Sequence, residues 1–80
     1  MAAVLTDAER SVLAAFVQNE KDDPEGAWNW FHHSISSAAG SESADAICRS
    51  LRRRKLLKGE GSGRFATYYP TDKGREALEA

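Results

Sequence analysis

Apolar residues at helical spacing dominate the first quarter of the chain. In LTDAERSVLAAFVQNE (residues 5–20), four residues recur three and four positions apart and form one stripe: Val12, Leu13, Phe16 and Val17. Thr6 followed three positions later by Glu9 is a capping-box pattern, which satisfies backbone donors at a helix start. The pattern predicts a helix over about residues 6–20, and the proline and glycine of KDDPEG end it.

A second helical pattern follows in AWNWFHHSIS. Trp28, Phe31 and Ile35 lie at i, i+3 and i+7, so we expect them to share a face while Trp30 points elsewhere. Gly40 is the expected helix stop, because glycine tolerates the left-handed conformation common at helix ends.

A third helix is predicted over about residues 42–55, ESADAICRSLRRRK, with Ser41 or Ser43 as its cap. Its apolar residues are expected to share the inner face: Ala44, Ile47, Cys48 and Leu51. Asp45, Arg49 and Arg52 recur on the outer face, which predicts a continuous charged stripe exposed to solvent.

After this helix, the spacing of the apolar residues no longer follows the helical repeat. KLLKGE and RFATYYP are short and rich in residues that favour strands, and GSG between them tolerates a tight turn. They predict a two-stranded hairpin over about residues 56–69, closed by Pro70. Thr71 can cap a short final helix in DKGREALEA. The predicted fold class is therefore mainly α with a small β-hairpin.

The net charge of −1 conceals a division along the chain. Residues 1–45 carry two bases against eight acids, a net charge of −6, whereas residues 46–80 carry nine bases against four acids, a net charge of +5. Such asymmetry is typical of a surface that meets a polyanion, or of two faces with different partners. The alternative is a chance segregation that folding mixes again, and the sequence leaves both open.

Length and composition narrow the class of protein. With 80 residues, of which 41% are hydrophobic, the chain is expected to form one small domain over residues 1–80. The start MAAVLTDAER lacks the regions of a secretory signal, no apolar run could span a bilayer, and a single cysteine cannot form an internal disulfide. We therefore expect a cytoplasmic protein that does not engage a membrane.

The segment from residue 43 to residue 78 combines a capped helix, a hydrophobic pair, a glycine-tipped hairpin with an arginine, and a closing Y-x-T-x-x-G-x-x-x-L pattern. The residues that carry this pattern are Leu51, Leu56, Leu57, Gly63, Arg64, Tyr69, Thr71, Gly74 and Leu78. It resembles the winged helix-turn-helix regulators of the MarR and PadR type, although Lys55 stands where such families usually carry a glycine. The resemblance implies three helices, a two-stranded wing and a short C-terminal helix.

The same resemblance implies a sequence-specific DNA-binding transcriptional regulator whose third helix enters the major groove. The expected base-reading residues are Ser43, Asp45, Arg49 and Arg52. The residues expected to neutralise phosphate are Arg53, Arg54, Lys55 and Lys58, and Arg64 at the wing tip is expected to reach phosphate or the minor groove. We expect double-stranded DNA as partner, a homodimer that matches a two-fold operator, and no cofactor.

Some of these residues have simpler interpretations that the sequence leaves open. Asp45 can satisfy the positive end of its helix, and Arg53 and Arg54 can solvate the other end and complement the helix dipole. Adjacent His32 and His33 diverge by about 100° on a helix and make a poor metal pair. Cys48 is expected to be a small core residue, so we expect no metal site, no catalytic residue and no enzyme activity.

Trp28 and Trp30 are candidate interface residues, because two positions apart on a helix they cannot both face one core. We expect Trp28 to be buried and Trp30 to be partly exposed, either as an interface anchor or packed on the wing or a loop. The rival function is a winged-helix protein-interaction module, an adaptor or inhibitor. Such a module would bind a protein through the acidic first half and an exposed tryptophan.

Overall fold

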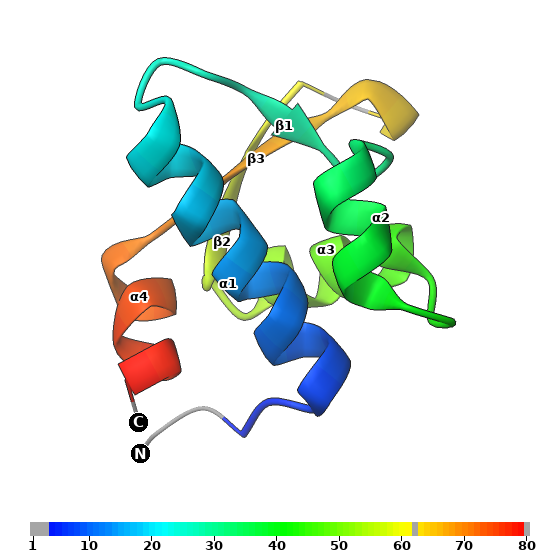
Figure 1. Ribbon diagram of the computed structural model, residues 1–80, viewed down its shortest axis with the longest axis vertical. Coiled ribbons are helices and arrows are strands. Elements are labelled where there is room, and N and C mark those ends of the chain that lie inside the picture. The colour runs from blue at the N-terminus through cyan, green and yellow to red at the C-terminus, as the bar shows by residue number, and fades with distance from the viewer. Residues whose placement is uncertain (1–3, 62, 80) are drawn as a thin grey trace.

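The computed structural model describes residues 4–61 and 63–79, which form four α-helices and a small three-stranded antiparallel sheet (Figure 1). The elements in chain order are α1 (Asp7–Asp22), β1 (Trp28–Asn29), α2 (His33–Ala39), α3 (Ala44–Arg53), β2 (Leu57–Glu60), the 3-10 turn η1 (Gly63–Phe65), β3 (Thr67–Pro70) and α4 (Asp72–Glu79). The mainly helical class is therefore confirmed. Ser62 and Ala80, expected in the hairpin tip and the last helix, lie outside the described residues.

The predicted capping box at the start of α1 is present. The Thr6 hydroxyl accepts from the Glu9 backbone N–H at 3.1 Å, and the Glu9 carboxylate accepts from the Thr6 N–H at 2.9 Å. Val12, Leu13 and Phe16 are fully buried, as the helical spacing predicts. The helix runs to Asp22, slightly further than expected, and ends before the proline.

The predicted helix through Trp28 is wrong. Trp28 lies in β1, where it pairs with Tyr68 of β3, and α2 begins only at His33, whose preceding residue His32 caps it by accepting from the Ser34 N–H. Phe31 therefore does not share the buried face of Trp28 and Ile35 and is 42% exposed. Pairing with β3 overrides the local helical spacing, a long-range contact that periodicity alone does not reveal.

The sheet also corrects the prediction of a two-stranded hairpin. β2 and β3 form the expected antiparallel hairpin, with Leu57 opposite Pro70 and Glu60 opposite Thr67. β1 adds a third strand on the other side of β3, giving the order β1-β3-β2. Residues 64 and 65, expected in the second strand, lie instead in η1, so Arg64 and Phe65 stand in the turn before β3 begins.

The end of α3 is a Schellman turn with a lysine at the position that glycine usually takes. The Lys55 N–H donates to the Arg52 carbonyl and the Leu56 N–H to the Leu51 carbonyl, both at 2.9 Å. Lys55 has φ 64°, the one left-handed backbone among the described non-glycine residues. The helix thus ends at Arg53, before the expected residue 55, and the strand pair starts at once.

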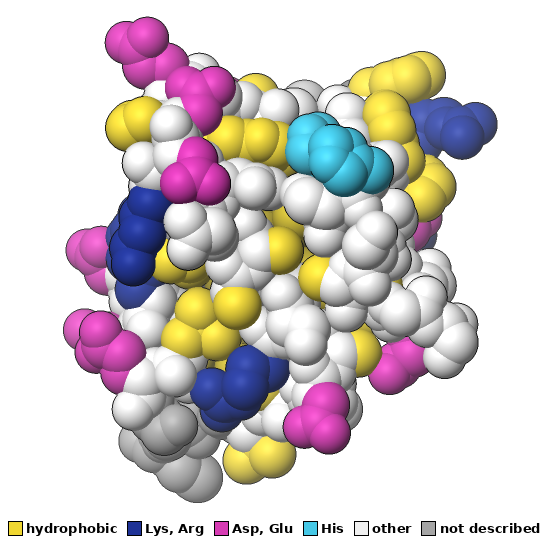
Figure 2. All heavy atoms as spheres, in the orientation of Figure 1, with side chains coloured by type: hydrophobic (Ala, Val, Ile, Leu, Met, Phe, Trp, Pro, Cys, Tyr) yellow, Lys and Arg dark blue, Asp and Glu magenta, His cyan; other side chains and the backbone are white. Residues whose placement is uncertain are grey.

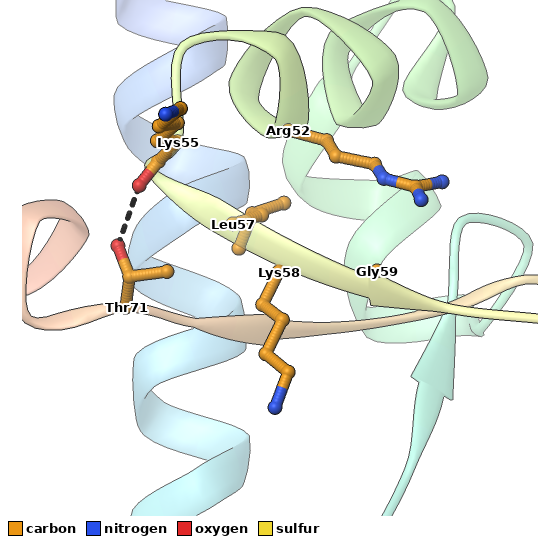
Figure 3. A pocket seen from close by; sticks show the side chains of 6 residues that line it. All are labelled: Arg52, Lys55, Leu57, Lys58, Gly59 and Thr71. Carbon is orange, nitrogen blue, oxygen red and sulfur yellow. Dashed lines mark hydrogen bonds between the residues drawn. The ribbon is translucent and has the colours of Figure 1, made fainter.

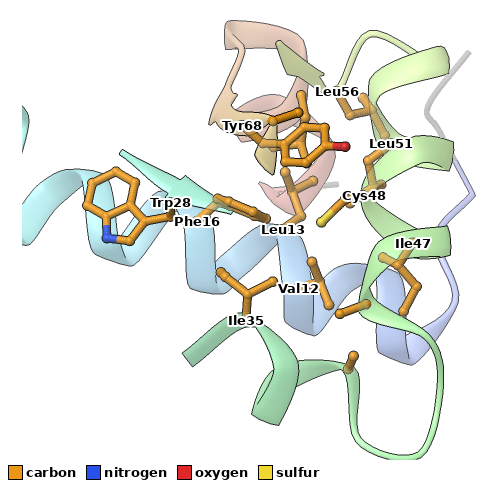
Figure 4. Close-up of a cluster of buried hydrophobic side chains, with 14 of the residues drawn as sticks. Val12, Leu13, Phe16, Trp28, Ile35, Ile47, Cys48, Leu51, Leu56 and Tyr68 are labelled. Carbon is orange, nitrogen blue, oxygen red and sulfur yellow. The ribbon is translucent and has the colours of Figure 1, made fainter. Parts of the chain in front are cut away.

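One core joins the helices and the strands (Figure 4). Its largest fully buried side chains are Phe16, Leu13, Ile35, Leu51, Leu56, Leu57, Val12 and Cys48. Phe16 meets the ring of Tyr68 edge to face at 6.2 Å, which ties α1 to β3. The predicted inner face of α3 is buried throughout, which leaves its other residues toward solvent.

Helix α4 approaches the backbone at Leu56 so closely that only a glycine fits. The Thr71 hydroxyl accepts from the Gly74 N–H at 3.0 Å, so Thr71 caps α4 as predicted, and it donates to the Lys55 carbonyl at 2.8 Å with the Leu56 carbonyl at 3.1 Å as a second acceptor. A Cβ built at Gly74 would lie 2.2 Å from the Leu56 carbonyl oxygen. Gly74 therefore sets how near α4 lies to the turn after α3.

Replacing Lys55 by glycine is expected to stabilise the protein by roughly 0.5–1 kcal/mol, because a side chain with positive φ carries a strain that glycine avoids. Urea unfolding measures the change. Lys55→Ala is the control, since it removes the same charge but keeps the strain. A glycine variant no more stable than the alanine variant would contradict the strain at this position.

Gly74→Ala is expected to destabilise the protein by at least about 2 kcal/mol, the opposite sign to the usual effect of alanine in a helix. The added methyl group would push α4 away from the Leu56 carbonyl. Thermal unfolding followed by circular dichroism tests this, with Glu76→Ala at an exposed position of the same helix as control. A neutral or stabilising Gly74→Ala would refute the close approach.

Candidate nucleic-acid interface

The exposed side of α3 carries a paired aspartate and arginine. The Arg49 guanidinium donates two hydrogen bonds to the Asp45 carboxylate, at 3.1 and 2.9 Å, and the Arg49 side chain is 65% exposed. The aspartate holds the arginine fork in one orientation at the solvent boundary. A guanine contact by Arg49 has to share or replace this pair, so Asp45 and Arg49 act as one unit. Ser43 also has a local role, because its hydroxyl accepts from the Ala46 N–H at 3.2 Å.

Arg52 reaches from α3 across β2. A Cβ built at Gly59 would lie 2.8 Å from the guanidinium carbon of Arg52, so the arginine passes directly over a strand position that has no side chain. Figure 3 shows Arg52 extended along β2 toward Gly59, with Lys58 leaving the strand on the opposite side. The contact links α3, the helix predicted to read the DNA bases, to the hairpin, and it places the Arg52 charge over β2.

An open hollow of about 390 Å³ lies where α3 passes into β2 (Figure 3). The residues that line it are Arg52, Lys55, Leu57, Lys58, Gly59 and Thr71. Three of them are cations, and none is acidic. The Arg52 and Lys58 side chains lie on opposite sides of β2 (Figure 3), so the cations surround the hollow rather than converge in it, and their charge favours an anion such as a backbone phosphate.

Arg54 lies apart from these cations. Its guanidinium donates to the Glu9 carboxylate at 3.0 Å and to the Val4 carbonyl at 2.7 Å, and its side chain is only 32% exposed. Arg54 therefore ties the end of α3 to the start of α1. This structural role is one that the four-base run in the sequence did not suggest.

The ion pairs resolve part of the charge asymmetry. Arg54 pairs with Glu9, Arg75 pairs with Glu20 and Asp72, and Arg49 pairs with Asp45, so three bases of the second half neutralise acids of the first. Within residues 4–61 and 63–79, no carboxylate pairs with Arg52, Arg53, Lys55, Lys58 or Arg64. We call these five residues, together with Arg49, the basic set. On the face over α1 and α2, basic side chains are sparse and acids lie along its edge (Figure 2).

Arg64 stands in η1 at the far end of the hairpin. The Trp30 indole N–H donates to the Arg64 carbonyl at 3.1 Å, and the Arg64 guanidinium lies 6.0 Å from the centre of the Phe65 ring. Trp30 is thus packed against the hairpin, one of the two alternatives for its position. Trp28 is only 8% exposed and is not a surface anchor.

Two residues near this surface were missed by sequence reasoning. Burial raises the pKa of Tyr68, with Cys48 and Asp45 adding to the rise and Arg52 and Arg49 opposing it, so the phenol is protonated at neutral pH. Its ring is buried beneath α3, where the strand alternation of β3 could have placed it. Phe65 is 73% exposed, and only its position in the turn reveals it as part of the surface.

The remaining candidate chemistry is structural. Burial raises the pKa of the Cys48 thiol to about 12, with the Asp45 charge adding to the effect, so the thiol is not ionised at neutral pH. The expected divergence of His32 and His33 is wrong, because His32 precedes α2 as its cap and the two rings stack with centres 4.6 Å apart. Among the described residues, no group of three or more histidine, cysteine, aspartate or glutamate side chains could hold a metal ion.

Comparisons of the chain with protein-family models, with curated proteins and with solved structures gave no match. No helix in the described part of the chain is long and apolar enough to cross a membrane. Function is therefore inferred from the surface itself.

Glu9 is expected to make stability depend on pH. Burial raises its pKa, but the Thr6 N–H and the Arg54 charge outweigh this, so the pKa falls below its usual value of 4.5. The carboxylate therefore contributes stability above pH 4.5 that is lost as the pH falls through its lowered pKa. Glu9→Gln is expected to cost about 1 kcal/mol at neutral pH and to flatten the loss of stability in acid.

Urea unfolding at neutral pH and in acid, compared with Glu79→Gln at an exposed position, measures this difference. Equal acid sensitivity of the Glu9→Gln variant and the unchanged protein would show that the Glu9–Arg54 pair does not contribute.

Proposed function

We propose that this chain is a winged helix-turn-helix domain that binds double-stranded DNA and regulates transcription, with α3 in the major groove and the β2–β3 hairpin as the wing. The observation that carries the proposal is the basic set, which lies on α3, the turn after it and the hairpin, and which lacks carboxylate partners within the described residues apart from the Asp45–Arg49 pair. A helix fits the major groove, and exposed arginines on it suit guanine and phosphate contacts.

The contacts divide by position. Arg49, oriented by Asp45, and Arg52, supported over Gly59, are the base-reading residues. Lys55 and Lys58 line the hollow beside Arg52 and bind backbone phosphate. Arg53 lies exposed at the end of α3. Arg64 contacts the flanking duplex from the hairpin tip. Ser43 serves as the helix cap and lies near the duplex without reading it.

Replacing Arg49 and Arg52 by alanine is expected to weaken binding at least tenfold, because each good bidentate base contact contributes about 1–3 kcal/mol of discrimination. Duplexes recovered from a randomised pool by the unchanged protein serve as probes, with scrambled duplexes for comparison. Fluorescence anisotropy at two salt concentrations gives the affinity and its salt dependence. The log–log slope is expected to fall by about 0.9 for each phosphate that a variant no longer neutralises.

The matched control compares Arg52→Ala with Lys21→Ala, since each variant removes one exposed cation. Lys21 lies at the end of α1 beside Asp22 and Asp23, so its removal is expected to leave DNA binding unchanged. No binding at low salt, or binding that ignores Arg49 and Arg52, would refute the proposal.

The protein-interaction alternative has one supporting observation. Asp22, Asp23 and Glu25 are exposed around the end of α1, where they form an acidic segment with only Lys21 among them. If the protein does not bind DNA at low salt, the protein-interaction module is the better explanation of its function. The expected homodimer is tested separately by light scattering, and a monomer at high concentration would exclude it.

A further inference from the structure

Three aromatic side chains meet at the tip of the hairpin. The rings of Trp30 and Phe31 lie 5.4 Å apart at an angle of 86°, and those of Phe31 and Phe65 lie 6.1 Å apart at 89°. Both contacts are edge to face, a favoured geometry for aromatic pairs. We call Trp30, Phe31 and Phe65 the aromatic corner. It joins the segment after β1 to η1, two parts of the chain that are far apart in sequence.

The aromatic corner is exposed although its rings are held by contacts with one another. Among the described residues, the exposed large hydrophobic side chains are Val4, Phe31 and Phe65, so two of the three lie at this corner. The Trp30 N–H bond to the Arg64 carbonyl and the two ring contacts hold Phe65 in place. An apolar group that is exposed and held in position indicates a contact surface, because it loses little conformational entropy on binding.

The charged residues around the aromatic corner indicate which class of molecule binds there. Residues 26–41 contain no acid, and residues 61–71 contain no acid and one base, Arg64. The Arg64 guanidinium lies beside the Phe65 ring, and His32 and His33 stack next in sequence to Phe31. A surface that combines an exposed aromatic ring with an arginine suits nucleic acid, whose bases stack and whose phosphates are negative; the acid nearest in sequence to the tip is Glu60, exposed at the end of β2.

The position of the corner relative to α3 fits the same duplex. Arg52 contacts β2 at Gly59, and the hairpin continues from there through Glu60, where β2 ends, to η1. A duplex that lies against both α3 and the hairpin therefore meets the tip beside its contact with α3. Figure 2 shows hydrophobic side chains beside a basic one at the corner of the molecule beyond the histidines.

We propose that Phe65 is an apolar wedge that enters the minor groove beside the α3 site, parts a base step and bends the duplex, with Phe31 and Trp30 supporting it from behind. This inference rests on the proposed DNA binding. Phenylalanine wedges that unstack a base step bend DNA by about 20–90°. Flexible TA and CA steps cost least to deform, so we expect the wedge to favour them at the flank of the site.

Phe65→Ala is expected to weaken binding about tenfold and to remove the bend, because the variant has no aromatic ring on which a base can stack. The probe is the tightest duplex recovered from the randomised pool, with a donor and an acceptor dye on its ends for energy transfer. A second copy carries 2-aminopurine at the flanking step, whose fluorescence rises when the base unstacks. Phe65→Leu keeps an apolar wedge and is expected to retain most of the bend.

Three further variants distinguish the effect of the wedge from effects on folding and from effects on DNA affinity alone. Val4→Ala removes exposed apolar surface elsewhere and is expected to change neither affinity nor bend. Phe31→Ala removes the support of Phe65 and is expected to reduce the bend while circular dichroism stays unchanged. Arg52→Ala is expected to lower affinity, yet the complex that still forms at low salt keeps its bend.

The outcomes distinguish this inference from the proposed function. If the unchanged protein does not bind DNA, both fail. If it binds through Arg49 and Arg52 but Phe65→Ala leaves the bend and the 2-aminopurine signal unchanged, the wedge alone is refuted. If Phe65→Ala instead abolishes self-association in light scattering and leaves the DNA complex intact, the corner is a protein interface and the wedge is again refuted.

Discussion

The backbone of Leu56 is the point on which the arrangement depends. Its N–H closes the end of α3 by donating to the Leu51 carbonyl, and its own carbonyl accepts from the Thr71 N–H and shares the Thr71 hydroxyl with the Lys55 carbonyl. Gly74 brings α4 against the same carbonyl, and the Leu56 side chain is fully buried. Helix α3, the hairpin and α4 thus meet at one residue, which fixes the angle at which the hairpin leaves the helix.

The angle between α3 and the hairpin determines which side chains lie together on the surface proposed to bind DNA. Because β2 starts directly after the turn, Gly59 comes under Arg52, and Lys55 and Lys58 come to line one hollow with it. Two other arginines, Arg54 and Arg75, stabilise the fold by pairing with acids of α1. The bases of the second half therefore divide into two groups, one that joins the elements and one that faces outward on α3 and the hairpin.

Sequence reasoning recovered the elements whose signals are local. The Thr6 capping box, the inner face of α3, the glycine-rich hairpin and the Thr71 cap all depend on residues a few positions apart, and all are present. The strand at Trp28 was missed, because its partner is Tyr68, forty residues later. The mainly helical class with a small sheet was thus predictable, whereas the third strand was not.

The same limit applies to the candidate site. The outward stripe of Asp45, Arg49 and Arg52 followed from helical spacing, but the run of four bases gave no sign that Arg54 turns toward Glu9. The aromatic corner was missed for the reason that β1 was missed, since it exists only where the segment after β1 meets the hairpin tip. The Arg54–Glu9 pair and the aromatic corner both depend on contacts between residues far apart in sequence, which no local pattern predicts.

The central claim is that α3 and the hairpin form one DNA-binding surface. A titration of isotope-labelled protein with a DNA duplex, followed by the chemical shifts of backbone amides, tests it most directly. We predict that the changes concentrate on α3, the turn at Lys55 and the β2–β3 hairpin, while the acidic segment around Asp22 stays unchanged. Changes that cluster at the acidic segment, or an absence of changes on α3, would contradict a DNA-binding role for this surface.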